Sequence, residues 1–181
     1  MNTYAIVCCY GLFDESFRTK EEMQGLVQYN QAVIETIIKL RQESGLKAAV
    51  ITGGYTQEGK PSESITNSIY IRDELARKEI NDFPLYIETI SHTTTENLVF
   101  GYTLIKDFNP EKIIIISDNH RKTKVQVEAK ILFKSLGIEL EFIALDRMDV
   151  HPASNYELQT HQHLPEEISS PYFQKLKALL E

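Results

Sequence analysis

Four consecutive isoleucines, Ile113 to Ile116, limit the possible folds of this chain more than any other feature. A strand with one face in water alternates apolar and polar side chains, whereas an unbroken β-branched run fits a strand covered on both faces. Strands of that kind occur in mainly parallel sheets, where crossover helices lie on both sides of the sheet. The run therefore predicts an α/β protein with a layered core.

Short apolar runs and longer amphipathic segments alternate along the rest of the chain. The expected strands cover residues 4–9, 47–52, 84–88, 112–117 and 139–145. The expected helices cover residues 21–43, the segment after Pro61-Ser62, and residues 93–108, 121–136 and 171–180. Strict alternation predicts a three-layer α/β/α sandwich: a Rossmann-like fold with a mainly parallel five-stranded sheet and a C-terminal tail helix. The default strand order for such a sheet is 3-2-1-4-5.

One domain accounts for the length of 181 residues. We expect the Rossmann-like domain to cover residues 1–145, and a C-terminal extension over residues 146–181 to pack on it. Residues 146–167 have no clear periodicity and are expected to be irregular. Ser170 as N-cap and Pro171 at the first helical position predict the start of the tail helix. Its apolar stripe is expected to cover the core of the domain.

Charge and apolar patterning exclude several classes of function. The chain has 19 Lys and Arg against 26 Asp and Glu, a net charge of −7, which argues against general binding to nucleic acid or to an anionic membrane. No apolar stretch is long enough to span a bilayer, and no signal peptide is visible. Cys8 and Cys9 are neighbours along a predicted strand and point to opposite faces, so we expect reduced thiols in a cytoplasmic protein.

Polar residues follow the predicted strands, at the sheet edge where α/β folds bind their ligands. The candidate residues are Gly11 after the first strand, Gly53, Gly54, Ser62 and Glu63 after the second, Glu88, Ser91, Thr94, Glu96 and Asn97 after the third, and Ser117, His120 and Arg121 around the end of the fourth. Because parallel strands end at one edge, we expect these groups to share one rim, with Gly54, Glu88, Asn97 and His120 lining a single cavity.

Each residue type suggests a role at that rim. Backbone N–H groups at the glycines and at the helix starts could hold phosphate or carboxylate oxygens. His120, Glu88 and Glu96 are the catalytic candidates, because an imidazole moves a proton near neutral pH and carboxylates accept from hydroxyls or amines. The other candidates are expected to bind the ligand. Helix caps at Ser62 and at Thr93 or Thr94, and a structural role for His120, are the simpler alternatives. Thr93 and Glu96 have the spacing of a capping box.

The cations Arg121, Lys122 and Lys124 at a helix start predict an anionic partner, either a protein carboxylate or a ligand phosphate. No metal site is expected. The pair His161 and His163, with glutamates nearby, has no recognisable ligand spacing. The chain lacks a Gly-x-Gly-x-x-Gly fingerprint, a P-loop and a Gly-x-Ser-x-Gly elbow, so those dinucleotide, nucleotide and hydrolase mechanisms have no support.

The same rim segments resemble a known family. They are Thr52-Gly53-Gly54, Ser62-Glu63-Ser64, the block from Glu88 to Asn97, and the apolar strand from Ile113 that leads to His120. Their order is similar to that of the YdcF/SanA/ElyC-like domain of unknown function, over roughly Tyr4 to Leu145. Two positions depart from the family pattern: Thr93 stands where the family usually has Asn, and Thr123 stands at the arginine of its His-x-x-Arg motif.

The resemblance implies a Rossmann-like fold with a polar pocket built from these motifs. With no anchor in its sequence, the chain resembles the soluble branch of the family, for which a nucleotide-like ligand, with S-adenosylmethionine as a candidate, is implied. We therefore expect a cytosolic protein that binds a nucleotide-like or anionic metabolite, S-adenosylmethionine or a phosphoester, with hydrolysis or group transfer as the reaction if it is an enzyme. The alternative is a non-catalytic ligand sensor or a partner-binding module.

Two roles are open for Glu88 and Asn97. They could form a buried structural network, or they could be held ready for a ligand in a wet cleft. Functional polar clusters are common at this edge of α/β sheets, and on that ground we expect the ligand role.

Overall fold

The computed structural model describes residues 1–16, 18–146 and 163–180 of the chain. Its centre is a five-stranded sheet with the order β3-β2-β1-β4-β5, in which every neighbouring pair is parallel. The strands are β1 (Thr3–Cys8), β2 (Ala48–Thr52), β3 (Leu85–Glu88), β4 (Lys112–Asp118) and β5 (Glu139–Leu145). This confirms the predicted Rossmann-like sheet, and the strand order matches the default for such a sheet. The order reverses between β1 and β4, because β2 and β3 lie on one side of β1 and β4 and β5 on the other.

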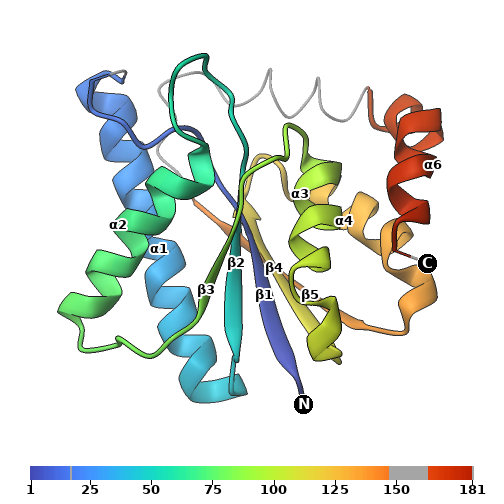
Figure 1. Cartoon of the computed structure of the whole chain (residues 1–181), viewed down its shortest axis with the longest axis horizontal. Helices are drawn as coiled ribbons and strands as arrows, with labels where there is room; N and C mark the ends of the chain where they lie inside the picture. The colour runs from blue at the N-terminus through green and yellow to red at the C-terminus, as the bar shows by residue number, and fades with distance from the viewer. Residues whose placement is uncertain (17, 147–162, 181) are drawn as a thin grey trace.

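Helices cover both faces of the sheet (Figure 1). On one face lie α1 (Lys20–Ser44) and α2 (Glu63–Arg77), and on the other lie α3 (Thr94–Thr103), α4 (Lys122–Leu132) and α6 (Pro171–Ala178). The isoleucine run shows the layering directly. Ile113 and Ile115 belong to the core under α3 and α4, Ile114 and Ile116 to the core under α1 and α2, and all four are at most 1 % exposed. The three-layer α/β/α sandwich is therefore confirmed.

Local sequence signals set several helix ends. α1 begins after Thr19, which forms a capping box with Glu22, and it ends at Gly45 in the left-handed conformation that glycine adopts without strain. The helix expected over 93–108 is shorter than predicted. α3 stops at Thr103, and a 3-10 turn, η1 (Lys106–Phe108), follows after the chain has turned Ile105 into the core. The helix expected over 121–136 likewise divides into α4 and a second 3-10 turn, η2 (Lys134–Leu136).

The C-terminal segment corrects part of the prediction. Residues 163–169 are helical, whereas residues 146–167 were expected to be irregular; the part of that prediction on residues 147–162 lies outside the described residues. α6 begins as expected, with Ser170 as N-cap and Pro171 in its first turn. Phe173, Leu176 and Leu180 pack into the same core as α3 and α4, while Leu179 is exposed.

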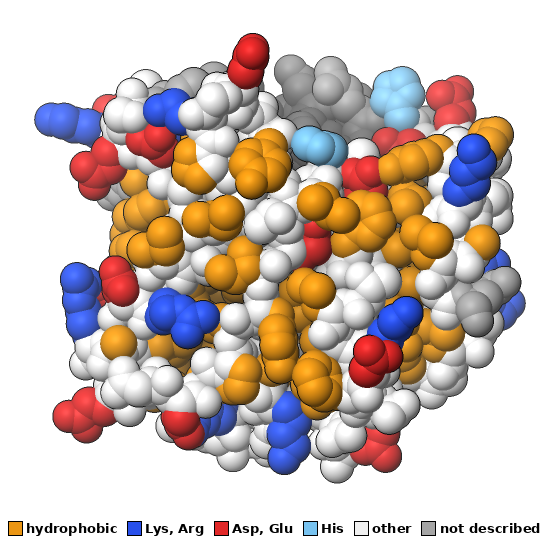
Figure 2. All heavy atoms as spheres, in the orientation of Figure 1, with side chains coloured by type: hydrophobic (Ala, Val, Ile, Leu, Met, Phe, Trp, Pro, Cys, Tyr) orange, Lys and Arg blue, Asp and Glu red, His pale blue; other side chains and the backbone are white. Residues whose placement is uncertain are grey.

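Among the described residues, no helix combines the length and the apolar character that a membrane crossing requires. The face in Figure 2 mixes acidic, basic and apolar side chains and has no continuous basic stripe. That surface is consistent with the net charge of −7, and the absence of nucleic-acid binding stays a prediction.

Candidate functional site

The strand order reverses between β1 and β4, the position at which open α/β sheets bind their ligands. Arg121 joins the segments that follow these two strands. Its Nη2 donates to the carbonyl oxygens of Cys9 at 2.7 Å and of Cys8 at 3.3 Å, and its Nε donates to the carboxylate of Asp118, which is fully buried. One side chain thus connects the carboxyl ends of β1 and β4 at the point where α/β sheets bind ligands.

The Arg121–Asp118 pair is electrostatically stable where it lies. Burial acts to lower the pKa of Arg121, but the Asp118 carboxylate, with smaller contributions from Cys8 and Tyr29, raises the pKa overall, so the guanidinium stays charged. An anionic partner was predicted for the cations at this helix start, and for Arg121 that partner is a protein carboxylate, Asp118. Lys124 is paired in the same way, with its Nζ 2.5 Å from Glu167 Oε2, and Lys122 is exposed. A ligand contact for Arg121 stays a prediction.

The glycine pair after β2 is required by the close approach of the loop after β3. The Gly54 N–H donates to the Ser91 carbonyl oxygen at 2.7 Å, and a Cβ added at Gly54 would lie 2.2 Å from that oxygen. Gly53 has φ +142°, where side-chain-bearing residues are strained. Any larger residue at Gly54 would push the two loops apart, so the pair brings the ends of β2 and β3 together.

Glu88, Ser91 and Asn97 form a buried network beside the glycines. Glu88 Oε1 accepts from the N–H groups of Ile90 at 2.6 Å and Ser91 at 2.9 Å, and Glu88 Oε2 accepts from the Ser91 hydroxyl at 2.5 Å and the Gly53 N–H at 3.4 Å. Ser91 Oγ also lies 2.5 Å from Asn97 Oδ1. None of Glu88, Ser91 and Asn97 is more than 7 % exposed. This geometry favours the structural role for Glu88, since both of its oxygens are engaged; its catalytic role and the ligand role of Asn97 stay predictions.

Glu96 closes the start of α3. Its Oε2 accepts from the N–H groups of His92 and Thr93, and the Thr93 hydroxyl accepts from the Glu96 N–H, which confirms the predicted capping box. Its Oε1 accepts from the hydroxyl of Tyr172 in α6. Burial raises the pKa of Glu96, but the Tyr172 hydroxyl and the two N–H groups outweigh burial and lower it. Glu96 is thus an ionised cap that links α3 to the C-terminal extension, and its catalytic role stays a prediction.

The start of α2 is also closed by the chain itself. The N–H groups of Glu63 and Ser64 donate to the carbonyl oxygens of Gly54 at 3.0 Å and Gly53 at 2.9 Å, and Ser62 Oγ accepts from the Ile65 N–H at 3.3 Å. Backbone donors that could hold an anion are therefore already used. The Glu63 side chain is half-buried, and its Oε1 accepts from the Thr56 hydroxyl at 2.8 Å.

The remaining candidates lie at the same edge of the sheet. The His120 N–H donates to Asp118 Oδ1 at 3.2 Å and its side chain is half-buried. Gly11 has φ +74° and its carbonyl oxygen accepts from Asn67 Nδ2 at 2.9 Å. Ser117 Oγ donates back to the Asp118 carbonyl at 3.2 Å, and Thr94, which is 8 % exposed, is the first residue of α3.

Cys9 shows that the groups after different strands do converge. Burial raises the pKa of the Cys9 thiol, Glu63 and Glu88 raise it further, and Arg121 acts against them. The contacts agree: a Cβ at Gly53 would lie 3.1 Å from Cys9 Cβ and 3.2 Å from Glu63 Cβ, the Gly53 N–H donates to Glu88 at the end of β3, and Arg121 donates to the Cys9 carbonyl oxygen. Burial also raises the pKa of Cys8 to about 11, and both cysteines are free thiols, as predicted. A single cavity lined by Gly54, Glu88, Asn97 and His120 stays a prediction.

The sequence interpretation assigned no role to Asp118 or Tyr172. Asp118 ends β4 only three residues before Arg121, and the nearness of opposite charges in the sequence could have identified the pair. Tyr172 reaches Glu96 from 76 residues away, and no local pattern reveals that contact.

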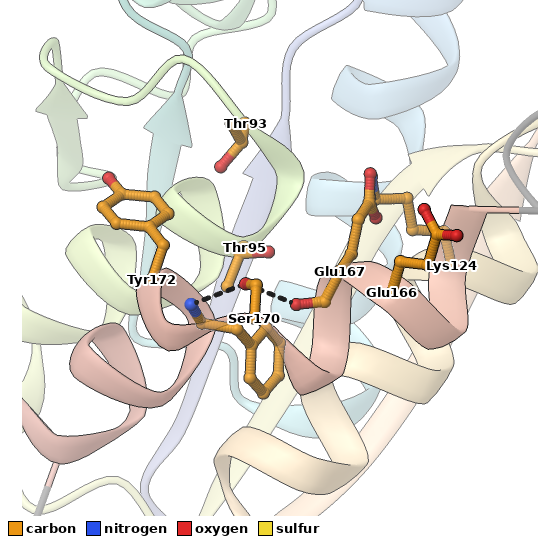
Figure 3. A pocket seen from close by; sticks show the side chains of 8 residues that line it. Thr93, Thr95, Lys124, Glu166, Glu167, Ser170 and Tyr172 are labelled. Atoms are coloured by element: carbon orange, nitrogen blue, oxygen red, sulfur yellow. Dashed lines mark hydrogen bonds and ion pairs between the residues drawn. The ribbon is translucent and has the colours of Figure 1, made fainter.

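A cavity of about 330 Å³ lies between the start of α3, α4 and the C-terminal helices (Figure 3). Thr93, Thr95, Lys124, Glu167, Tyr172 and Phe173 are among the residues that line it. Three of its hydroxyls, at the start of α3 and on Tyr172, are bound within the protein: Thr93 caps α3, Thr95 donates to Glu128, and Tyr172 donates to Glu96. The cavity therefore marks a seam between the extension and the domain rather than a site with unused donors.

Within the described ranges, no group of three or more His, Cys, Asp or Glu residues is placed to hold a metal ion. His163 Nδ1 lies 3.8 Å from Glu166 Oε2, and His161 lies outside the described residues, so the absence of a metal site stays a prediction.

Comparison of the chain with models of known families, with curated proteins and with solved structures finds no match.

Proposed function

We propose that this protein binds a small nucleotide-like or anionic metabolite at the carboxyl edge of its sheet, with S-adenosylmethionine and a phosphoester as the candidate ligands. The observation that carries the proposal is the convergence at the β1–β4 reversal: Arg121 connects the two strand ends, and Gly53 brings Cys9, Glu63 and Glu88 close together. Sheets of this order bind their ligands where the strand order reverses.

The geometry favours the nucleoside-like candidate over the phosphoester. The helix starts at Ser62 and Thr93 are closed by side chains and backbone of the chain itself, and the charge of Arg121 is offset by Asp118. Glu63 and His120 are half-buried at the rim and are therefore the groups we assign to the ligand. A carboxylate such as Glu63 suits ribose hydroxyls or an amine, which S-adenosylmethionine offers without a phosphate.

If the protein turns its ligand over, we propose hydrolysis or group transfer with His120 as the proton carrier. The alternative is a ligand sensor without turnover. The contact between Tyr172 and Glu96 supports that alternative, because it joins the C-terminal extension to α3, the helix that carries Asn97 of the buried network.

We also propose membership of the YdcF-type family and a cytoplasmic location. Support for the family comes from the residues that carry the resemblance, since Gly54, Glu88 and Asn97 each hydrogen-bond to Ser91, and Gly54 comes from a different segment than the other three. The location rests on the sequence alone.

The test is isothermal titration calorimetry of the purified protein with S-adenosylmethionine, S-adenosylhomocysteine, AMP and inorganic phosphate. Binding of the adenosyl compounds with weak or no binding of phosphate is the expected result. Glu63→Gln should weaken binding tenfold or more, about 1.4 kcal/mol, while the exposed control Glu35→Gln should leave it unchanged. Binding of phosphate alone would favour the phosphoester over the nucleoside-like ligand. No binding of any of the four compounds would contradict the proposal.

Turnover distinguishes the enzyme from the sensor. Product formation that His120→Ala abolishes, with binding retained, supports the enzyme, and tight binding with no product supports the sensor.

A further inference from the structure

An acidic cluster joins the C-terminal helices to the domain. Glu128 of α4 is 0 % exposed, and its Oε2 accepts from the Thr95 hydroxyl of α3 at 2.9 Å. Glu167, from the helical residues 163–169, reaches the same place, because Lys124 Nζ lies within 4 Å of both carboxyl groups. Three segments that lie far apart in the sequence therefore meet at one pair of carboxyl groups, beside the cavity in Figure 3.

The cluster has fewer donors than acceptors. Glu128 Oε1 is buried and accepts no hydrogen bond from the described residues, and the buried Glu167 Oε2 has the Lys124 ammonium as its close donor. One cation serves both: Lys124 Nζ lies 2.5 Å from Glu167 Oε2 and 3.8 Å from Glu128 Oε1. Two ionised carboxylates with one lysine would leave a buried excess negative charge and an unsatisfied acceptor, which is a costly arrangement. A single proton between the two carboxyls removes both defects.

We infer that one proton shared by Glu128 and Glu167 holds the C-terminal helical arm, residues 163–180, against α3 and α4, and that loss of this proton loosens the arm. The apolar contacts of Phe173, Leu176 and Leu180 remain when the proton leaves, so the arm loosens rather than dissociates. The device makes the docking of the extension depend on pH.

The electrostatics of Glu128 fix the pH range. Burial raises the pKa of Glu128 to about 7, with Lys124 and the Thr95 hydroxyl acting against burial and Glu167 acting with it. Once the arm is loose, water reaches the carboxyl and its pKa returns toward the ordinary value of 4.5. The docked state then binds more protons than the loosened one between these two values. Docking is strongest below about pH 4.5 and is lost as the pH rises through about 7.

Other titratable groups near the cluster do not explain such a change. Cys8 of β1 faces Glu128, but burial holds the pKa of its thiol at about 11. Tyr172 of α6 has its pKa raised by the hydrogen bond to Glu96, so it stays neutral over this range. On the arm itself, His163 is 65 % exposed and pairs with Glu166, and it is tested by a control variant below.

The arm also reaches the candidate site. The Tyr172 hydroxyl donates to Glu96, whose other oxygen caps α3, and Asn97 follows directly. When the arm loosens, α3 loses this hydrogen bond, and α3 is the helix that carries Asn97 of the buried network with Glu88 and Ser91. Only this last step rests on the proposed function; the pH-dependent docking does not require a ligand.

Hydrogen–deuterium exchange of the full chain at pH 6 and pH 8, corrected for the intrinsic pH dependence of exchange, tests the inference. One proton with a docked pKa of about 7 predicts that protection of residues 163–180 falls about tenfold between these pH values. Peptides from β4 serve as the internal reference and should change little. Glu128→Gln and Glu167→Gln each replace the shared proton with a permanent amide donor, so both should abolish the change. Glu166→Gln and His163→Gln are the matched controls on the arm and should keep it.

Unchanged protection of residues 163–180 in the wild-type protein would overturn the inference, and so would a tenfold change that persists in the Gln variants. A parallel loss in β4 would mean that global stability changes instead, and would also overturn it. If Glu128→Gln does not fold, Glu167→Gln decides alone, because its side chain is 40 % exposed and tolerates the substitution. None of these outcomes depends on ligand binding, so they separate this inference from the proposed function.

Discussion

Replacing Glu88 separates the two roles that the sequence left open for it. Its carboxylate makes three contacts of 2.9 Å or less, to the Ile90 N–H, the Ser91 N–H and the Ser91 hydroxyl, and a weaker one to the Gly53 N–H at 3.4 Å. Ser91 is 1 % exposed, whereas Ile90 is exposed and its N–H can bond to water instead. Removing the Glu88 carboxylate therefore leaves a buried donor without a partner at Ser91. A buried donor without a partner costs about 1–3 kcal/mol.

We expect Glu88→Ala to lower the free energy of unfolding by about 3 kcal/mol, the sum of the unpaired Ser91 N–H and the weakened hold on the Ser91 hydroxyl. Glu88→Gln keeps one oxygen for the two loop N–H groups but turns an amide donor toward the Gly53 N–H, so a smaller loss of about 1 kcal/mol is expected. Glu35→Ala, at an exposed position of α1, should stay within about 0.5 kcal/mol of wild type.

Urea unfolding followed by circular dichroism measures all three variants. With an m-value of about 2 kcal/mol/M, a loss of 3 kcal/mol moves the midpoint by about 1.5 M at unchanged slope. If Glu88→Ala unfolds at the same midpoint as Glu35→Ala while ligand binding is lost, the structural argument is refuted and Glu88 belongs to the ligand site.

Three other substitutions test the rim and its connection to the extension. Gly54→Ala places a Cβ 2.2 Å from the Ser91 carbonyl oxygen and should lower the free energy of unfolding by about 2–4 kcal/mol in urea. The control Gly59→Ala, where φ is +71° and nothing lies within 4 Å of the added Cβ, should cost about 1 kcal/mol. Equal losses would contradict the close approach of the two loops. Arg121→Met removes the guanidinium from the buried Asp118 carboxylate and should lower the free energy of unfolding by about 3–5 kcal/mol, measured from the shift of the urea midpoint. A loss below about 1 kcal/mol would contradict the connection between β1 and β4. Tyr172→Phe removes one charge-assisted hydrogen bond, so a loss of about 1.5 kcal/mol and faster hydrogen exchange at the start of α3 are expected; unchanged exchange there would mean that the extension does not support that helix.

Features that depend only on residues close together in the sequence could be predicted from it. The isoleucine run indicated a strand buried on both faces because side chains alternate along any strand, and Ile113 to Ile116 alternate between the two cores as expected. The capping box of Thr93 and Glu96 was visible because both residues lie within one helical turn. Strict alternation of elements predicted the parallel sheet, whereas the strand order could only be assumed as the default for this class of fold.

The partners of the polar side chains were decided only in the tertiary structure. Arg121 meets the carbonyl oxygen of Cys9 across 112 residues, and Tyr172 meets Glu96 across 76. Sequence can place a polar group at the rim, because the end of a strand is a local property. Whether that group faces solvent or another part of the chain depends on which distant segments the sheet order brings beside it. Glu128 is the clearest case, since its helical pattern is ordinary and its burial follows from α3 and the C-terminal helices closing over it.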